Sequence, residues 1–160
     1  MEAFVSEYKA LIVFVHVISA VVWVGGMVAM RFAAHPSFLE IESPQKRLER
    51  ISHALKNLFK IVVPFVALLL VTALMLIIGL GLSKSDFAIF SHAKEGIWTL
   101  MALNLGAMIF RRGRADKLLA KGDFVGAKNQ LELIGKFMVP LNIALGVIAI
   151  FLGALLSSNL

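Results

Sequence analysis

The chain has 160 residues, of which 59% are hydrophobic and only 16% are charged. An ordinary soluble domain has roughly 25% charged residues, so this composition excludes that class and indicates a membrane protein. The length predicts one domain, residues 1–160, with no room for a separate soluble part.

The charge and the lack of cysteine narrow the chemistry further. The net charge is +6, but the basic residues lie between hydrophobic runs, so nucleic acid is not an expected partner. Because there is no cysteine, disulfides, iron–sulfur clusters and thiolate metal sites are excluded. Any metal is expected on His, Met, carboxylate or backbone ligands.

Four stretches contain no Asp, Glu, Lys or Arg: residues 10–30, 61–83, 96–110 and 137–160. Three of them reach the roughly 20 residues that a helix needs to cross the hydrocarbon layer. The third is shorter, so its helix is expected to begin near Phe87, which places His92 and Lys94 near the membrane interface. The pattern predicts an all-α fold, an integral membrane four-helix bundle.

The positive charges predict the orientation of this bundle. Of the 16 Lys and Arg residues, 13 flank the first and third connections and 3 lie at the other face. Because Lys and Arg accumulate on the cytoplasmic side, both termini are expected outside the cytoplasm. The chain is predicted to be a multi-pass protein of the cell inner membrane.

Both basic connections are expected to contain helix. Ser43 followed by Pro44 is typical of an N-cap and a first helical turn, and Asp123 after Gly122 opens a similar segment. Apolar residues then recur on one face, at Leu48, Ile51, Leu55 and Leu58 and again at Ala127, Leu131 and Ile134. The second and fourth spans are therefore predicted to begin as cytoplasmic helices.

The two halves of the chain share a few positions. An offset of 76 residues pairs His16 with His92, Lys60 with Lys136, Val63 with Val139 and Pro64 with Pro140. We interpret this as a duplicated helix hairpin, whose copies are related by an axis along the membrane normal. His16 and His92 are equivalent in this interpretation.

His16 lies about two turns inside the first span, where an ionisable side chain is costly unless it has a role or a partner. It is either a neutral histidine hydrogen-bonded to a neighbouring helix or a ligand. The second histidine, His92, favours a ligand pair, because bundle cores bind cofactors with side chains from facing helices. We predict that His16 and His92 ligate a metal or haem beside Trp23, where Gly25 and Gly26 leave room.

Other polar residues allow two interpretations each. Lys94 either reaches the membrane interface together with Glu95 or pairs with a haem propionate or another anion. Arg31 is also able to pair with such an anion, on the cytoplasmic side. His35 and His53 lie near basic residues at the cytoplasmic interface, where a hydrated histidine is the ordinary case.

The amides and thioethers inside the spans also have expected roles. Asn104 and Asn142 are expected to form interhelical hydrogen bonds. The methionines of the spans are expected to fill the core, and with the histidines they also suit Cu(I), which keeps copper open as an alternative to haem. They are Met27, Met30, Met75, Met101, Met108 and Met138.

The string HVISAVVWVGGM, from His16 to Met27, resembles the opening helix of a superfamily of small membrane proteins. This superfamily includes the copper-resistance D type proteins and the HemJ-type protoporphyrinogen oxidases. The string from His92 to Lys94 resembles the His-x-Lys at the start of the third helix of the HemJ type. The resemblance covers most of the chain, but the Asn-Glu-x-Pro string of the HemJ type has no counterpart here.

The resemblance implies a protein that binds haem b through His16 and His92, with Trp23 and Lys94 beside the cofactor. Its role is expected in electron transfer or in the oxidation of a porphyrinogen or quinone-linked substrate, as a membrane oxidoreductase. Expected partners are the lipid bilayer, haem, a quinone or another membrane redox protein, and a second copy of the chain. The alternatives are a copper-handling or copper-transport protein and a structural or assembly subunit.

Overall fold

A computed structural model describes residues 2–79 and 88–158, and the side chains of residues 3–79 and 93–155. Every regular element in these residues is a helix, so the all-α prediction is confirmed. The elements are α1 (Glu2–Glu7), α2 (Lys9–Ala29), η1 (Met30–Ala34), α3 (His35–Leu39), α4 (Pro44–Gly79), α5 (Ala88–Ala120), α6 (Phe124–Leu133), η3 (Ile134–Met138) and α7 (Val139–Ser158). The two η elements are π-helices.

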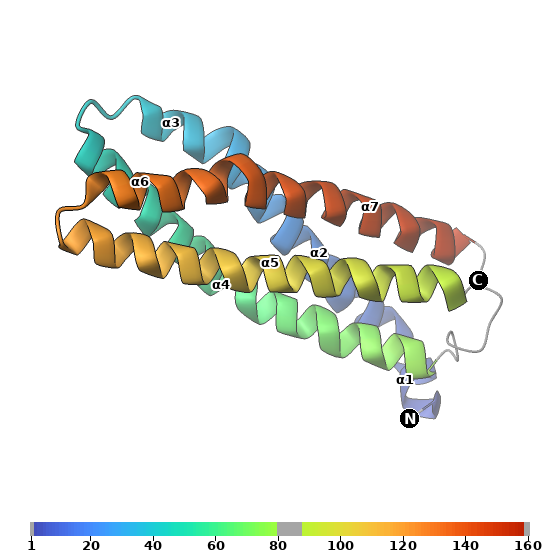
Figure 1. Ribbon diagram of the computed structural model, residues 1–160. Helices are drawn as coiled ribbons and strands as arrows, with labels where there is room; N and C mark the ends of the chain where they lie inside the picture. The colour runs from blue at the N-terminus through green and yellow to red at the C-terminus, as the bar shows by residue number, and fades with distance from the viewer. Residues whose placement is uncertain (1, 80–87, 159–160) are drawn as a thin grey trace.

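The long helices lie side by side along one axis (Figure 1). The α2 helix packs against α4 and α7, and α5 packs against the same two helices, so α2 and α5 lie diagonally opposite each other. Both ends of the chain lie at one end of the molecule, which we name the terminal end. The connections at residues 40–43 and 121–123 lie at the opposite end, which we name the basic end.

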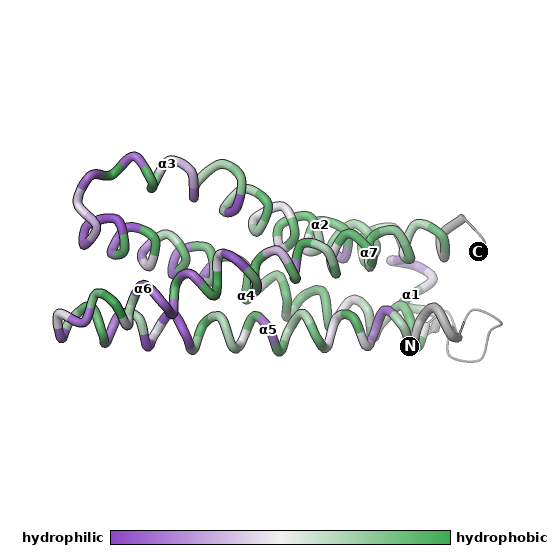
Figure 2. The backbone as a smooth tube through the Cα atoms, turned by 45° about the horizontal axis from the view of Figure 1, so that its top comes forward, coloured by the Kyte–Doolittle hydropathy of each residue, from purple (hydrophilic) through white to green (hydrophobic). Residues whose placement is uncertain are grey.

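Three helical segments are long and apolar enough to cross a membrane: Lys9–Leu39, Pro44–Gly79 and Phe124–Leu155. Only 17–28% of their most apolar windows is buried inside the molecule, so large apolar side chains such as Phe14, Leu68 and Phe151 point outward. Soluble proteins rarely expose apolar patches of this extent. Figure 2 shows that polar residues concentrate toward the basic end. These features support a membrane protein.

The helix starts predicted in the basic connections are confirmed. The α4 helix begins at Pro44, with the Lys46 amide 3.4 Å from Ser43 Oγ. The α6 helix follows Asp123, whose Oδ1 accepts a hydrogen bond of 2.8 Å from the Gly126 amide. Gly122 adopts a φ of 77°, a conformation that favours glycine. Local side-chain chemistry therefore sets both starts.

The two π-helices share a sequence feature. Pro36 and Pro140 each lie two residues after the last residue of a π-helix, η1 and η3 respectively. A proline ring clashes with the carbonyl group four residues before it, and the wider π-turn moves that carbonyl away. Pro64, by contrast, lies within the regular helix α4. The predicted equivalence of Pro64 and Pro140 therefore does not extend to their local backbone conformation.

Candidate functional site

A polar group connects α2 and α4 inside the apolar terminal half of the bundle. His16 is half-buried on α2, and its Nδ1 lies 3.0 Å from Oγ1 of Thr72 on α4. Thr72 is 5% exposed and interrupts an otherwise apolar stretch of its helix. The interhelical hydrogen bond expected of a histidine that is not a ligand is therefore present, and it uses Nδ1 of His16.

The hydrogen bonds of Thr72 favour one of the two tautomers of His16. The Thr72 hydroxyl lies 2.8 Å from the Leu68 carbonyl oxygen and 3.1 Å from the Leu69 carbonyl oxygen, and it donates its single hydrogen there. Its oxygen therefore accepts from Nδ1–H of His16. This tautomer leaves Nε2 of a neutral imidazole with a free lone pair, which is the form that binds a metal.

Lys94 brings a positive charge against α7, near the terminal end of the molecule. It lies on α5 and is half-buried, and its Nζ is 3.2 Å from where a Cβ would lie at Gly153 of α7. A side chain at residue 153 would occupy the space that the ammonium group uses. The ammonium group of Lys94 therefore lies against α7.

Two indole groups in the core lack hydrogen-bond acceptors among the described residues. Nε1 of Trp23 and Nε1 of Trp98 are both buried and have no partner there. Trp98 lies one turn after Lys94 on α5, and Trp23 lies two turns after His16 on α2. An unpaired buried donor costs roughly 1–3 kcal/mol. These donors therefore favour a ligand rich in acceptor atoms.

The second predicted ligand, His92, lies in the second turn of α5, because that helix begins at Ala88. Its side chain lies outside the described residues, so the predicted pairing with His16 stays a prediction. The helices that carry the two histidines, α2 and α5, occupy opposite corners of the bundle. A ligand bound by both histidines would lie at the centre of the bundle, between these two helices.

The described residues contain no group of three or more His, Cys, Asp or Glu side chains that could hold a metal ion. A bare metal site of such ligands is therefore not seen in this part of the chain. Haem needs fewer protein ligands, because the porphyrin supplies four nitrogen ligands and the protein supplies only the axial ones.

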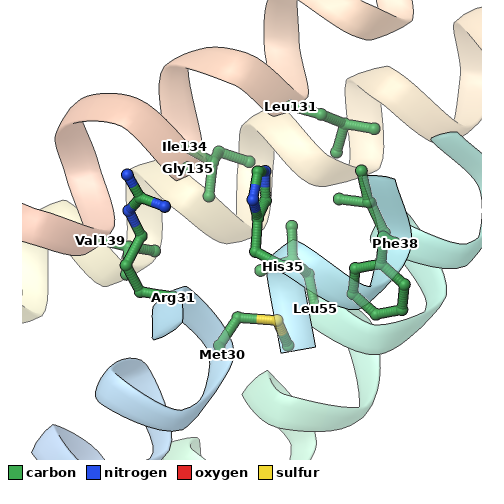
Figure 3. Close-up of a pocket in the computed structure, with 10 residues that line it drawn as sticks. Met30, Arg31, His35, Phe38, Leu55, Leu131, Ile134, Gly135 and Val139 are labelled. Atoms are coloured by element: carbon green, nitrogen blue, oxygen red, sulfur yellow. The ribbon is translucent and has the colours of Figure 1, made fainter. Parts of the chain in front are cut away.

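The histidines at the basic end differ from each other. His53 is exposed on α4, as expected for a hydrated side chain. His35 is half-buried and, with Arg31, lines a cavity between the two π-helices (Figure 3). These two histidines could not be separated from the sequence, because only their tertiary neighbours distinguish them.

Sequence reasoning missed Thr72 and Trp98. Thr72 is a lone hydroxyl within a long apolar stretch, and this was an available signal, since a polar group inside a span usually has an interhelical partner. Trp98 carries the same kind of signal, an indole N–H that needs an acceptor. Neither signal predicts which residue is the hydrogen-bond partner.

The predicted amide bonds between helices are confirmed. Asn104 Nδ2 of α5 donates to Asn142 Oδ1 at 2.7 Å and to the Met138 carbonyl oxygen at 2.8 Å. Asn142 is 1% exposed, and its Nδ2 lies 3.4 Å from the Met101 carbonyl oxygen. The pair joins α5 to the junction of η3 and α7, so we assign it a structural role.

Replacing Asn142 by Leu is expected to lower the free energy of unfolding by about 1 kcal/mol, because Asn104 loses a buried partner. Unfolding of the full chain in detergent micelles measures this loss. Asn57→Leu, at an exposed position of α4, is the control and is expected to have little effect. Equal losses in the two variants would show that the amide pair adds no stability.

Comparison of the chain with protein-family models, curated proteins and solved structures finds no match. The function is therefore inferred from the geometry of the chain itself.

Proposed function

We propose that the chain is a membrane protein of four spans that binds one haem b, with His16 and His92 as axial ligands. Its role is electron transfer or the oxidation of a porphyrin-like or quinone-linked substrate. The observation that carries the proposal is the hydrogen bond from His16 to Thr72, because it holds Nε2 of a half-buried imidazole ready to bind a metal.

The packing of α5 supports a fourth span. It runs between the two ends of the molecule and contacts both α4 and α7, which carry two of the apolar spans. A helix in this position lies at the same membrane depth as its neighbours. The 13 basic residues beside the two basic connections support a cytoplasmic basic end.

The donor groups of the interior fit haem. The lone pair of His16 Nε2 suits an axial site, and Lys94 with the Trp98 indole N–H suits the propionate carboxylates. Neither of the two cavities described at the basic end includes His16, so the macrocycle would replace packed side chains such as Trp23. Haem supplies the electron transfer, and the chain supplies ligands, burial and charge.

Copper is the second candidate, because thioether groups gather in one core. Met27, Met101 and Met108 are all buried and pack in the cluster that contains Trp23. Thioether sulfur and imidazole are both suitable ligands for Cu(I). A structural or assembly subunit is the third candidate and requires neither cofactor.

One absorption spectrum separates these candidates. Protein purified in detergent from haem-sufficient cells is expected to show a Soret band and a six-coordinate, low-spin form with one haem per chain. The metal content of the same sample tests copper. Absence of the Soret band would overturn the haem proposal, and a fixed copper content would then support the second candidate.

The orientation is tested with reporters at the two ends of the molecule. A periplasmic reporter fused after Leu160 is expected to be active, and the same reporter inserted beside Gly122 is expected to be inactive, because the basic connections stay in the cytoplasm. A cytoplasmic reporter at the same two sites is expected to give the opposite result. The reverse pattern would contradict the proposed orientation.

A further inference from the structure

The two π-helices lie on opposite sides of one cavity near the basic end. Residues of η1 and η3 line it, including Arg31 on one side and Ile134 and Gly135 on the other. Figure 3 shows Arg31 and His35 extending toward the η3 side, with Leu55 and Phe38 along the wall. The free space inside this cavity is about 20 Å³, which is room for about one water molecule, and its mouth is open to solvent. π-Helices are rare, and many of those that occur lie at functional sites. Two of them beside one cavity therefore point to a binding site.

The polar side chains of this cavity are basic. Among the described residues, Arg31 and His35 line it and no carboxylate does. In the described residues Arg31 forms no ion pair, and its guanidinium carbon lies 5.8 Å from the Phe32 ring centroid. By contrast, Arg47 donates twice to the Ile41 carbonyl oxygen, at 3.1 and 2.7 Å. The cavity therefore suits an anionic group with an apolar body.

The position of the cavity indicates where such a ligand comes from. Arg31 is the first charged residue after the apolar stretch 10–30, so it lies at the depth where lipid phosphates begin. Each π-helix also exposes a large aromatic side chain, Phe32 at 68% and Phe137 at 65%. The hydrocarbon layer therefore extends to the π-helices. Basic pockets between spans on the cytoplasmic side are typical sites for anionic lipid headgroups.

A second cavity extends the first toward the basic end. It shares Ile51 and Leu131 with the first cavity, and its volume is about 290 Å³. Arg47 and Lys128 line it together with Glu132. We name the two adjoining cavities the groove, and its lining becomes more charged away from the π-helices.

We propose that this groove binds one anionic phospholipid of the adjacent leaflet, with its phosphate on Arg31 and His35. The guanidinium group is suited to two parallel hydrogen bonds to phosphate oxygens, and the half-buried imidazole adds one donor. The proposal depends on the chain being a membrane protein and not on the haem.

Native mass spectrometry of the full chain, released from mixed vesicles of phosphatidylglycerol and phosphatidylcholine, tests the site. The wild type is expected to retain one phosphatidylglycerol in preference to phosphatidylcholine. Arg31→Gln is expected to lower that preference by about tenfold, and His35→Gln by a smaller factor. Lys46→Gln removes an equal charge from an exposed position at the basic end and is expected to have no effect.

A second variant tests the cavity without changing any charge. A Cβ at Gly135 would lie 3.9 Å from His35 Nε2, so Gly135→Leu fills the space beside the imidazole. It is expected to lower lipid retention as Arg31→Gln does. Gly113→Leu, where a Cβ meets nothing within 4 Å, is the matched control.

Three results would overturn the proposal. The first is a loss of lipid in Lys46→Gln equal to that in Arg31→Gln, which would indicate surface attraction alone. The second is unchanged retention in both Arg31→Gln and Gly135→Leu. The third is complete displacement of the lipid by millimolar inorganic phosphate, which would show that the site binds a free anion and not a lipid.

Discussion

Replacing His16 by Ala is expected to remove the low-spin haem spectrum. Without this axial ligand the protein is expected either to purify without haem or to give a five-coordinate, high-spin form through His92. The absorption spectrum and the haem content per chain measure the change. His53→Ala, which changes an exposed histidine at the basic end, is expected to leave the spectrum unaltered. A low-spin spectrum that persists in both His16→Ala and His92→Ala would contradict the proposed ligands.

The role of Thr72 is tested by Thr72→Val, which keeps the side-chain shape and removes the acceptor for Nδ1–H. Loss of a group that orients a ligand typically lowers metal affinity roughly 10–100-fold, and a loss of that size is expected for haem. Thr99→Val is the matched control, because Thr99 is exposed and its hydroxyl donates within its own helix, to the Glu95 carbonyl oxygen at 2.8 Å. Equal haem affinity in the two variants would show that Thr72 does not position His16.

Replacing Gly146 by Leu is expected to destabilise the bundle strongly. A Cβ at this position of α7 would lie 2.5 Å from Val24 Cγ2 and 3.3 Å from Met101 Cε, so the helices must separate. Val24 is β-branched and turns away with difficulty. Overpacking of this kind costs typically 1–3 kcal/mol, and the thermal midpoint of the full chain in detergent is expected to fall.

Gly106→Leu is the control for this substitution. A Cβ at Gly106 meets nothing within 4 Å, and leucine favours helix more than glycine does. Its thermal midpoint is therefore expected to stay unchanged or to rise. If Gly146→Leu behaved in the same way, the close approach of α7 to α2 would not be a determinant of stability.

Features set by neighbouring residues in the sequence were predictable. The helix starts at Pro44 and Phe124 follow from N-cap and glycine signals, and the role of Asn104 follows from an amide in an apolar stretch. The π-helices were not predicted, although Pro36 and Pro140 mark them, because a proline in a long helix is equally compatible with a kink or a helix start.

Features set by contacts between distant residues were not predictable. Thr72 lies 56 residues from His16, and the apolar pattern of α4 does not show which neighbouring helix its polar side chain meets. The same holds for His35, which gains its significance only because η3 lies opposite. The sequence did predict the residue types of the candidate site, because ionisable groups inside spans stand out against apolar neighbours.

The length of α4 has a consequence for the energetics of the molecule. Its 36 residues extend over about 54 Å, whereas the hydrocarbon layer is about 30 Å thick. The basic end, where Ser52 donates a hydrogen bond to Asp116, therefore stands in water. Water drives apolar burial there, but in lipid the helices associate through van der Waals packing and polar bonds. A change of temperature is therefore expected to alter the stability of the basic end more than that of the spans. Amide hydrogen exchange at the basic end is expected to report local unfolding there while the spans stay packed together.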